Sequence, residues 1–155
     1  MRAAVLAFLF LTATGAFAAK HPDFTGAWEF NPGKSKNIGM IMQAKMTSTI
    51  TQTNSAIDES THSNFQDSEQ EMKTHYDLTG TPASNESPMA GASETVSKWE
   101  GEKLITIWTS QSAIAGGAKI VRTETRWLSP DGNTMTIESV RGTNPPVVMV
   151  FEKKK

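Results

Sequence analysis

Hydrophobic and polar residues alternate in short runs along most of the chain, which is typical of β-strands that have one buried face. The clearest run is residues 71–78, where even positions are apolar or hydroxyl-bearing and odd positions are charged or histidine. Turn-forming Gly, Pro, Asn and Asp residues separate the runs. We therefore predict nine strands, at residues 24–30, 45–53, 56–63, 71–78, 92–99, 103–110, 118–128, 134–141 and 147–152.

Most connections between these strands are short, so each strand should pair with the next one. Pro130-Asp131-Gly132 is the strongest of the hairpin turns. Because closing a sheet removes its exposed edges, we predict a single antiparallel up-and-down β-barrel, lipocalin-like, of about 8–10 strands. A Greek-key sandwich is the alternative, and it would need longer crossover connections. Residues 79–91, which contain two Gly and two Pro, are predicted to form a loop.

The first 18 residues have the order of features found in an export signal. Met1-Arg2 is positively charged, residues 3–12 are apolar, and Ala16-Phe17-Ala18 places small residues where a signal peptidase cuts. The apolar run is too short to span a bilayer. We expect removal of residues 1–18, which leaves one barrel domain at 19–155, secreted or in a bacterial periplasm. A buried N-terminal helix is the alternative.

Composition and charge exclude several classes of function. The 15 basic and 16 acidic residues give a net charge of −1, which provides no electrostatic basis for binding nucleic acid. The chain has no Cys, so it has no disulfide, thiol nucleophile, thiolate metal site or lipid-anchor cysteine. The common hydrolase, metalloprotease and nucleotide-binding motifs are absent. We expect no enzymatic activity, cofactor or metal; if the chain were an enzyme, Glu124 and Arg126 would be the candidate pair.

The segment 24–28 reads F-T-G-A-W at the start of the first predicted strand. A Gly-x-Trp there, followed by a meander, resembles the calycins, which include lipocalins and fatty-acid-binding proteins. Residues 31–35 (NPGKS) and 126–132 (RWLSPDG) are similar to segments of small secreted bacterial lipocalin-like proteins, and the C-terminal strand resembles the fatty-acid-binding branch. The resemblance implies that Trp28, with Gly26 beside it, closes the barrel floor. It also implies that an Arg from a late strand packs over the indole; the candidates by position are Arg122, Arg126 and Arg141.

A barrel of this size encloses side chains or one small ligand. We expect the ligand to be a small apolar or amphipathic molecule, held against Met and aromatic side chains with one or two polar groups to orient it. The candidate ligand-binding residues are Met40, Met42, Tyr76, Trp108, Arg122 and Arg126. Met40 and Met42 lie where fatty-acid-binding proteins have a helical lid, and Tyr76 and Trp108 are candidates for the wall.

The direction in which strand 118–128 faces decides the role of its arginines. Arg122, Glu124 and Arg126 share one face, and a second face carries Val121 and Trp127. The Val/Trp face is easier to bury, because an unpaired buried charge is costly, so the charged face is expected in solvent. The alternative is that the charged face points into the barrel, and a buried Arg could then bind a ligand carboxylate through two hydrogen bonds.

Two other groups of polar residues are expected at the surface. The acidic residues Asp58, Glu59, Glu69 and Glu71 belong to the most polar part of the chain. His62 and His75 are predicted to face each other across a hairpin as solvated side chains rather than as metal ligands.

The expected function is that of a secreted, monomeric binding protein for a small lipophilic molecule. The alternative is a barrel packed solid, an envelope component or a protease-inhibitor-like protein that acts through loops such as residues 79–91.

Overall fold

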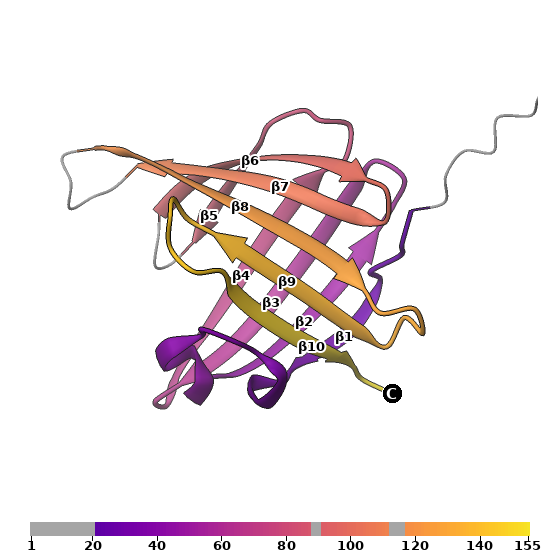
Figure 1. The fold of residues 1–155 in the computed structure, drawn as a ribbon, viewed down its shortest axis with the longest axis vertical. Helices are drawn as coiled ribbons and strands as arrows, with labels where there is room; N and C mark the ends of the chain where they lie inside the picture. The colour runs from indigo at the N-terminus through magenta and orange to yellow at the C-terminus, as the bar shows by residue number, and fades with distance from the viewer. Residues whose placement is uncertain (1–20, 88–90, 112–116) are drawn as a thin grey trace, which may run out of the picture.

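A computed structural model of the protein describes residues 21–87, 91–111 and 117–155. The predicted signal peptide, residues 1–18, lies outside the described residues. Ten antiparallel strands and two short 3₁₀ helices make up the described part of the chain (Figure 1). The strands are β1 (Gly26–Phe30), β2 (Lys45–Gln52), β3 (Ala56–Phe65), β4 (Ser68–Asp77), β5 (Ala83–Ser87), β6 (Gly91–Glu100), β7 (Lys103–Gln111), β8 (Lys119–Leu128), β9 (Thr134–Val140) and β10 (Val147–Lys153), and the helices are η1 (Pro32–Lys34) and η2 (Gly39–Gln43).

The strands form one sheet in the order β4-β3-β2-β1-β10-β9-β8-β7-β6-β5. Consecutive strands pair with each other except β4 and β5, which form the two edges of the sheet. β1 also pairs with β10 and thereby joins the first strand to the last. The sheet curls into a nearly closed barrel (Figure 1), which confirms the predicted up-and-down β-barrel. The nine predicted strands are all present.

The tenth strand corrects the prediction that residues 79–91 form only a loop. β5 has the sequence Ala-Ser-Asn-Glu-Ser and alternates strictly, with Ala83 and Asn85 buried and Ser84 and Glu86 exposed. It pairs with β6 along its whole length. The strand gave no hydrophobic signal because its inward positions are occupied by a small residue and an amide.

The two edge strands, β4 and β5, are joined by one side chain. The amide of Asn85 accepts a hydrogen bond from the backbone N–H of His75 (2.8 Å) and donates one to the His75 carbonyl (2.9 Å). It also donates to the hydroxyl of Thr95 on β6 (3.0 Å). A side-chain amide has the same donor and acceptor as a peptide group. Asn85 therefore makes, between β4 and β5, the pair of hydrogen bonds that two backbones make elsewhere in the sheet.

Aromatic residues close the end of the barrel at which β1 begins. Phe24 and Trp28 are completely buried, and the indole N–H of Trp28 donates to the carbonyl of Phe24 (2.9 Å). The ring of Trp99 is stacked parallel to the rings of Phe24 and His21, with centroid distances of 6.0 and 4.4 Å. The helices η1 and η2 connect β1 to β2 at the opposite end of the barrel (Figure 1).

The cation over Trp28 is a lysine and not one of the three arginines considered from the sequence. The Nζ of Lys153 lies 5.3 Å from the centroid of the Trp28 ring. Gly26, with φ of +143°, leaves room for it, because a Cβ atom there would lie 2.9 Å from Cε of Lys153. β10 therefore extends one residue beyond the predicted end at 152, since Lys153 is its last residue.

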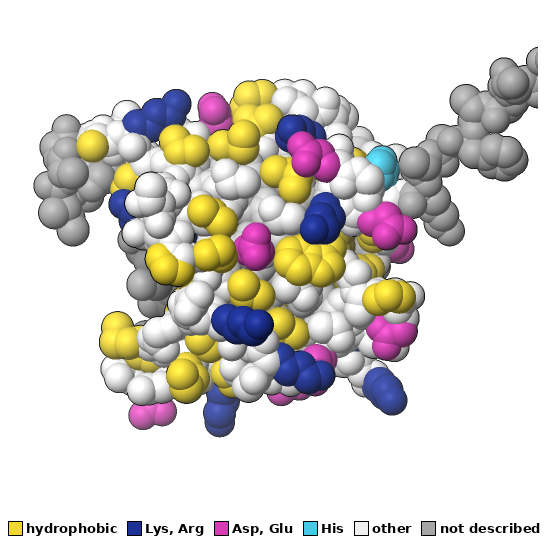
Figure 2. Space-filling model, in the orientation of Figure 1, with side chains coloured by type: hydrophobic (Ala, Val, Ile, Leu, Met, Phe, Trp, Pro, Cys, Tyr) yellow, Lys and Arg dark blue, Asp and Glu magenta, His cyan; other side chains and the backbone are white. Residues whose placement is uncertain are grey.

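The outer face of the barrel mixes apolar and polar side chains. Figure 2 shows hydrophobic side chains interspersed with charged and polar ones over β7 to β10. Ile107 and Val121 are exposed there, and the Nζ of Lys103 lies 5.0 Å from the centroid of the Trp127 ring. Among the described residues, no helix is both long enough and apolar enough to cross a membrane.

Candidate ligand-binding site

The charged face of β8 points into the barrel, which corrects the expectation that it would be solvated. Arg126 pairs with Leu104 on β7 and with Ile137 on β9, and both of these residues are buried. Directly opposed residues of neighbouring strands share one face of the sheet, so Arg126 must be buried with them. The exposed fractions of Arg126 and Glu124 are 2% and 7%.

Arg126 is held by groups from both sides of the barrel. Its Nη2 donates to Oε2 of Glu59 on β3 at 2.8 Å, to the hydroxyl of Tyr76 on β4 at 3.0 Å, and to Oε1 of Glu124 at 3.3 Å. Its guanidinium carbon lies 5.0 Å from the centroid of the Tyr76 ring. Ion pairs and hydrogen bonds of this kind offset the cost of burying a charge.

Glu59 contradicts the expectation that the acidic residues of the polar stretch lie at the surface. It is buried, and its Oε1 accepts a hydrogen bond from the hydroxyl of Ser48 at 2.5 Å. Its strand neighbour on the same face, Ile57, is also buried, so the alternation of β3 already pointed inward. The polarity of the surrounding sequence concealed this signal.

Burial and ion pairing act in opposite directions on these groups. Burial alone would raise the pKa of Glu59, but Arg126 and the hydrogen bonds from Ser48 and Tyr76 outweigh it and lower the pKa. Burial raises the pKa of the Tyr76 hydroxyl well above its ordinary value. Burial would lower the pKa of Arg126, yet Glu59 and its neighbours raise it. The site thus holds a carboxylate, a guanidinium and a neutral phenol at neutral pH.

Trp108 and Arg122 extend this site toward the η2 end. The Trp108 and Tyr76 rings meet edge to face with centroids 5.9 Å apart, and the guanidinium of Arg122 lies 4.7 Å from the centroid of the Trp108 ring. Nη2 of Arg122 is 3.8 Å from Oε2 of Glu124. The Arg122 side chain is 42% exposed. We call this group the Arg126 cluster; its members are Glu59, Tyr76, Trp108, Arg122, Glu124 and Arg126.

Within the described residues, four buried side-chain nitrogens have no hydrogen-bond partner. They are Nε1 of Trp108, Nε of Arg122, and Nε and Nη1 of Arg126. All four are donors, and all belong to the Arg126 cluster. Buried donors are rarely left without a partner, so these four atoms mark where an acceptor oxygen, from water or from a ligand, would bind. Four of the six predicted ligand-binding residues therefore meet at one place.

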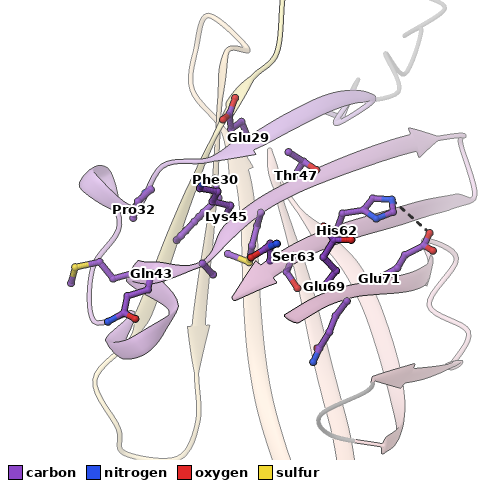
Figure 3. Close-up of a pocket in the computed structure, with 15 residues that line it drawn as sticks. Glu29, Phe30, Pro32, Gln43, Lys45, Thr47, His62, Ser63, Glu69 and Glu71 are labelled. Atoms are coloured by element: carbon purple, nitrogen blue, oxygen red, sulfur yellow. Dashed lines mark ion pairs between the residues drawn. The ribbon is translucent and has the colours of Figure 1, made fainter. Parts of the chain in front are cut away.

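The other two predicted ligand-binding residues lie apart from this cluster. Met40 and Met42 belong to η2 and are exposed by 74% and 61%. Met42 borders a depression of about 750 Å³ at the η2 end of strands β1 to β4 (Figure 3). Polar side chains from β3 and β4, among them His62 and Glu71, line its far side. The roles predicted for Met40 and Met42 at the mouth of the barrel stay predictions.

The two histidines do not face each other, contrary to the sequence-based expectation. His62 is opposite Glu71 and His75 is opposite Asp58, because the hairpin turns at Gln66 and Asp67. Nδ1 of His75 lies 2.7 Å from Oδ1 of Asp58. In the part of the chain that the structure describes, no three His, Asp or Glu side chains are grouped so that they could hold a metal ion.

Solved structures with the same barrel are known, although the sequence matches no protein-family model and no curated protein. Fatty-acid-binding protein 1 of Echinococcus granulosus superposes with a TM-score of 0.63 at 14% identity, over 85% of this chain and 98% of its own. The chain has the fold of the fatty-acid-binding proteins. Lipid binding protein 8 of Caenorhabditis elegans (TM-score 0.63, 15% identity) covers 84% of this chain and 95% of its own. A Schistosoma mansoni fatty-acid-binding protein in complex with arachidonic acid superposes with a TM-score of 0.63 at 16% identity, over 85% of this chain and 96% of its own. The calycin-type barrel predicted from the Gly-x-Trp motif is thus confirmed at the level of the fold.

Proposed function

We propose that the protein binds a small amphipathic molecule inside the barrel, as a monomer and without catalysis. The observation that carries this proposal is the set of four unpartnered N–H donors in the Arg126 cluster. Ligand sites of proteins combine apolar walls with a few converging polar groups, and unsatisfied buried donors mark where such a group would bind. The likeness to fatty-acid-binding proteins supports the same function.

The arrangement of the interior supports one orientation of the ligand. Arg122, which is partly exposed, lies four residues from buried Arg126 along β8, a distance of roughly 13 Å. Apolar side chains at the η2 end, including Phe30, Met46 and Met149, would contact the ligand's apolar part. Its polar group would then reach the Arg126 cluster, with Met40 and Met42 flanking the entrance.

A displacement assay tests the proposal. Nile red, a neutral dye that fluoresces in apolar sites, is bound to the purified protein and challenged with single-chain amphiphiles. We expect displacement by at least one of them, together with a change in tryptophan fluorescence, since Trp108 belongs to the Arg126 cluster. The variant Ile107→Ser, on the outer face of β7, is the control and should bind alike. A correctly folded protein that binds neither dye nor amphiphile would contradict the proposal and favour a solid barrel acting through its loops.

We also propose that the protein is exported, because residues 1–18 have the features of a cleavable signal. Expression of the full chain in a bacterial host, followed by fractionation and intact-mass measurement, tests this. A periplasmic or secreted product that begins at Ala19 is expected. A cytoplasmic product that retains Met1 would contradict it.

A further inference from the structure

The charges of the Arg126 cluster already balance one another. Arg126 is ion-paired with Glu59 at 2.8 Å and with Glu124 at 3.3 Å. Arg122 is paired with Glu124 at 3.8 Å. The cluster therefore contains two guanidinium cations and two carboxylates. Glu59, Glu124 and Arg126 are the buried charged side chains of the described residues, and Arg122, 42% exposed, lies at their edge. A ligand carboxylate would bring an uncompensated negative charge among groups that are already neutral together.

The buried N–H groups of the cluster lack an acceptor. Both oxygens of Glu59 accept hydrogen bonds, from Ser48 and Arg126, and Oε1 of Glu124 accepts one from Arg126. Oε2 of Glu124 lies 3.8 Å from Nη2 of Arg122, an ion pair without a hydrogen bond. The unpartnered atoms are all N–H groups of Trp108, Arg122 and Arg126. A carbonyl oxygen accepts two hydrogen bonds and brings no proton of its own, whereas a hydroxyl would also need an acceptor for its proton.

We infer that the polar group bound at the Arg126 cluster is an uncharged carbonyl, as in an ester or a ketone, and that the site disfavours a free carboxylate. This inference rests on the proposed function, since it specifies the ligand that the barrel takes. Two physical effects support it. Bringing an anion out of water is costly unless a free cation receives it, and two carboxylates placed close together repel each other.

A matched pair of ligands tests the inference on the wild-type protein. Dodecanoic acid and methyl dodecanoate have the same acyl chain; near neutral pH the head group of the first is a carboxylate and that of the second an uncharged methyl ester. In Nile red displacement near neutral pH, below the concentration at which either compound aggregates, the ester is expected to bind at least about tenfold more tightly. In ¹H–¹⁵N spectra the indole N–H signal of Trp108 should shift on binding, because that donor is free. The Trp28 indole, already bonded to Phe24, is the internal control and should stay in place.

A variant that removes one carboxylate from the Arg126 cluster provides a second test of the inference. Glu124→Gln leaves two guanidinium groups facing one carboxylate, so the acid should gain affinity relative to the ester by about tenfold. Glu138→Gln makes the same charge change on β9, at a position opposite Thr125 on the outward side, and should leave the ratio unchanged. Should Glu124→Gln fail to fold, the wild-type comparison decides alone.

The outcomes separate this inference from the proposed function. An acid that binds as tightly as the ester, or more tightly, would overturn the inference and leave the binding function standing. If neither compound displaces bound Nile red and neither moves the Trp108 signal, the inference is overturned; a folded protein that also binds neither the dye nor any other amphiphile contradicts the proposed function as well. A shift of the Trp28 signal with none at Trp108 would place the ligand away from the Arg126 cluster and would also overturn the inference.

Discussion

Arg126 and Glu59 join two walls of the barrel through a single ion pair of 2.8 Å. Arg126 lies on β8 and Glu59 on β3, and four strands separate β8 from β3 in the sheet. Both side chains are buried, so neither can be compensated by water. Each therefore depends on the other, and a change to one partner leaves a buried charge.

The first prediction concerns the loss of the cation. Arg126→Met leaves Glu59 and Glu124 buried without their main counter-ion, and we expect the free energy of unfolding to fall by about 3–5 kcal/mol. Chemical denaturation near neutral pH measures the change. The control is Arg141→Met, because Arg141 is exposed and the same substitution there should cost less than about 0.5 kcal/mol. Equal stability of the two variants would show that the buried pair contributes nothing.

The second prediction concerns pH. The pKa of Glu59 is lower in the folded protein than its ordinary value of 4.5. A lowered pKa means that the ionised form stabilises the fold; this contribution is complete above 4.5 and is lost as the pH falls through the folded-state pKa. Denaturation measured from pH 7 down to pH 3 should therefore show stability falling with acid. Glu59→Gln should make this dependence shallower, and Ser48→Ala should do so to a smaller degree. A Glu59→Gln profile parallel to that of the wild type would refute the assignment.

The third prediction concerns Gly26. Gly26→Ala imposes two costs: a positive φ that an L side chain rarely adopts, and a Cβ that collides with Cε of Lys153. We expect a loss of about 1–3 kcal/mol in thermal or chemical unfolding. The double variant Gly26→Ala/Lys153→Ala removes the collision and keeps the strain, so it should recover part of the loss. A double variant that recovers nothing would assign the whole effect to the backbone.

The fourth prediction concerns the junction of β4 and β5. Asn85→Ala removes the amide that bonds both backbone groups of His75, and we expect a loss of about 1–3 kcal/mol. The amide proton of His75 should then exchange faster with solvent, which hydrogen exchange followed by NMR measures directly. Ser84→Ala, at the exposed position beside it, is the matched control. Unchanged exchange at His75 would mean that Asn85 does not hold the edges together.

The positions of most strands could be predicted from the sequence, because burying one face of a strand makes hydrophobic and polar residues alternate with a period of two residues. Residues 71–78 show this most clearly, and Pro130-Asp131-Gly132 marks a turn that the structure contains. Asp131 fixes that turn with hydrogen bonds from Ser129 and Asn133, which lower its pKa to about 2. β5 was missed because Ala83 and Asn85 carry no hydrophobic signal, although they occupy inward positions.

Local sequence by itself determined where nine of the ten strands are, where they turn, and that the sheet could close, since alternation and turn chemistry depend on neighbouring residues. The tertiary structure alone decided that the charged face of β8 is buried. Taken within its own strand, Arg126 has no partner sufficient to offset its desolvation, and the Val/Trp face looks easier to bury. Glu59 and Tyr76, at least 50 residues away in sequence, provide the missing compensation. Only closure of the barrel brings these charges together, because electrostatic energy depends on distance in space and not on separation along the chain.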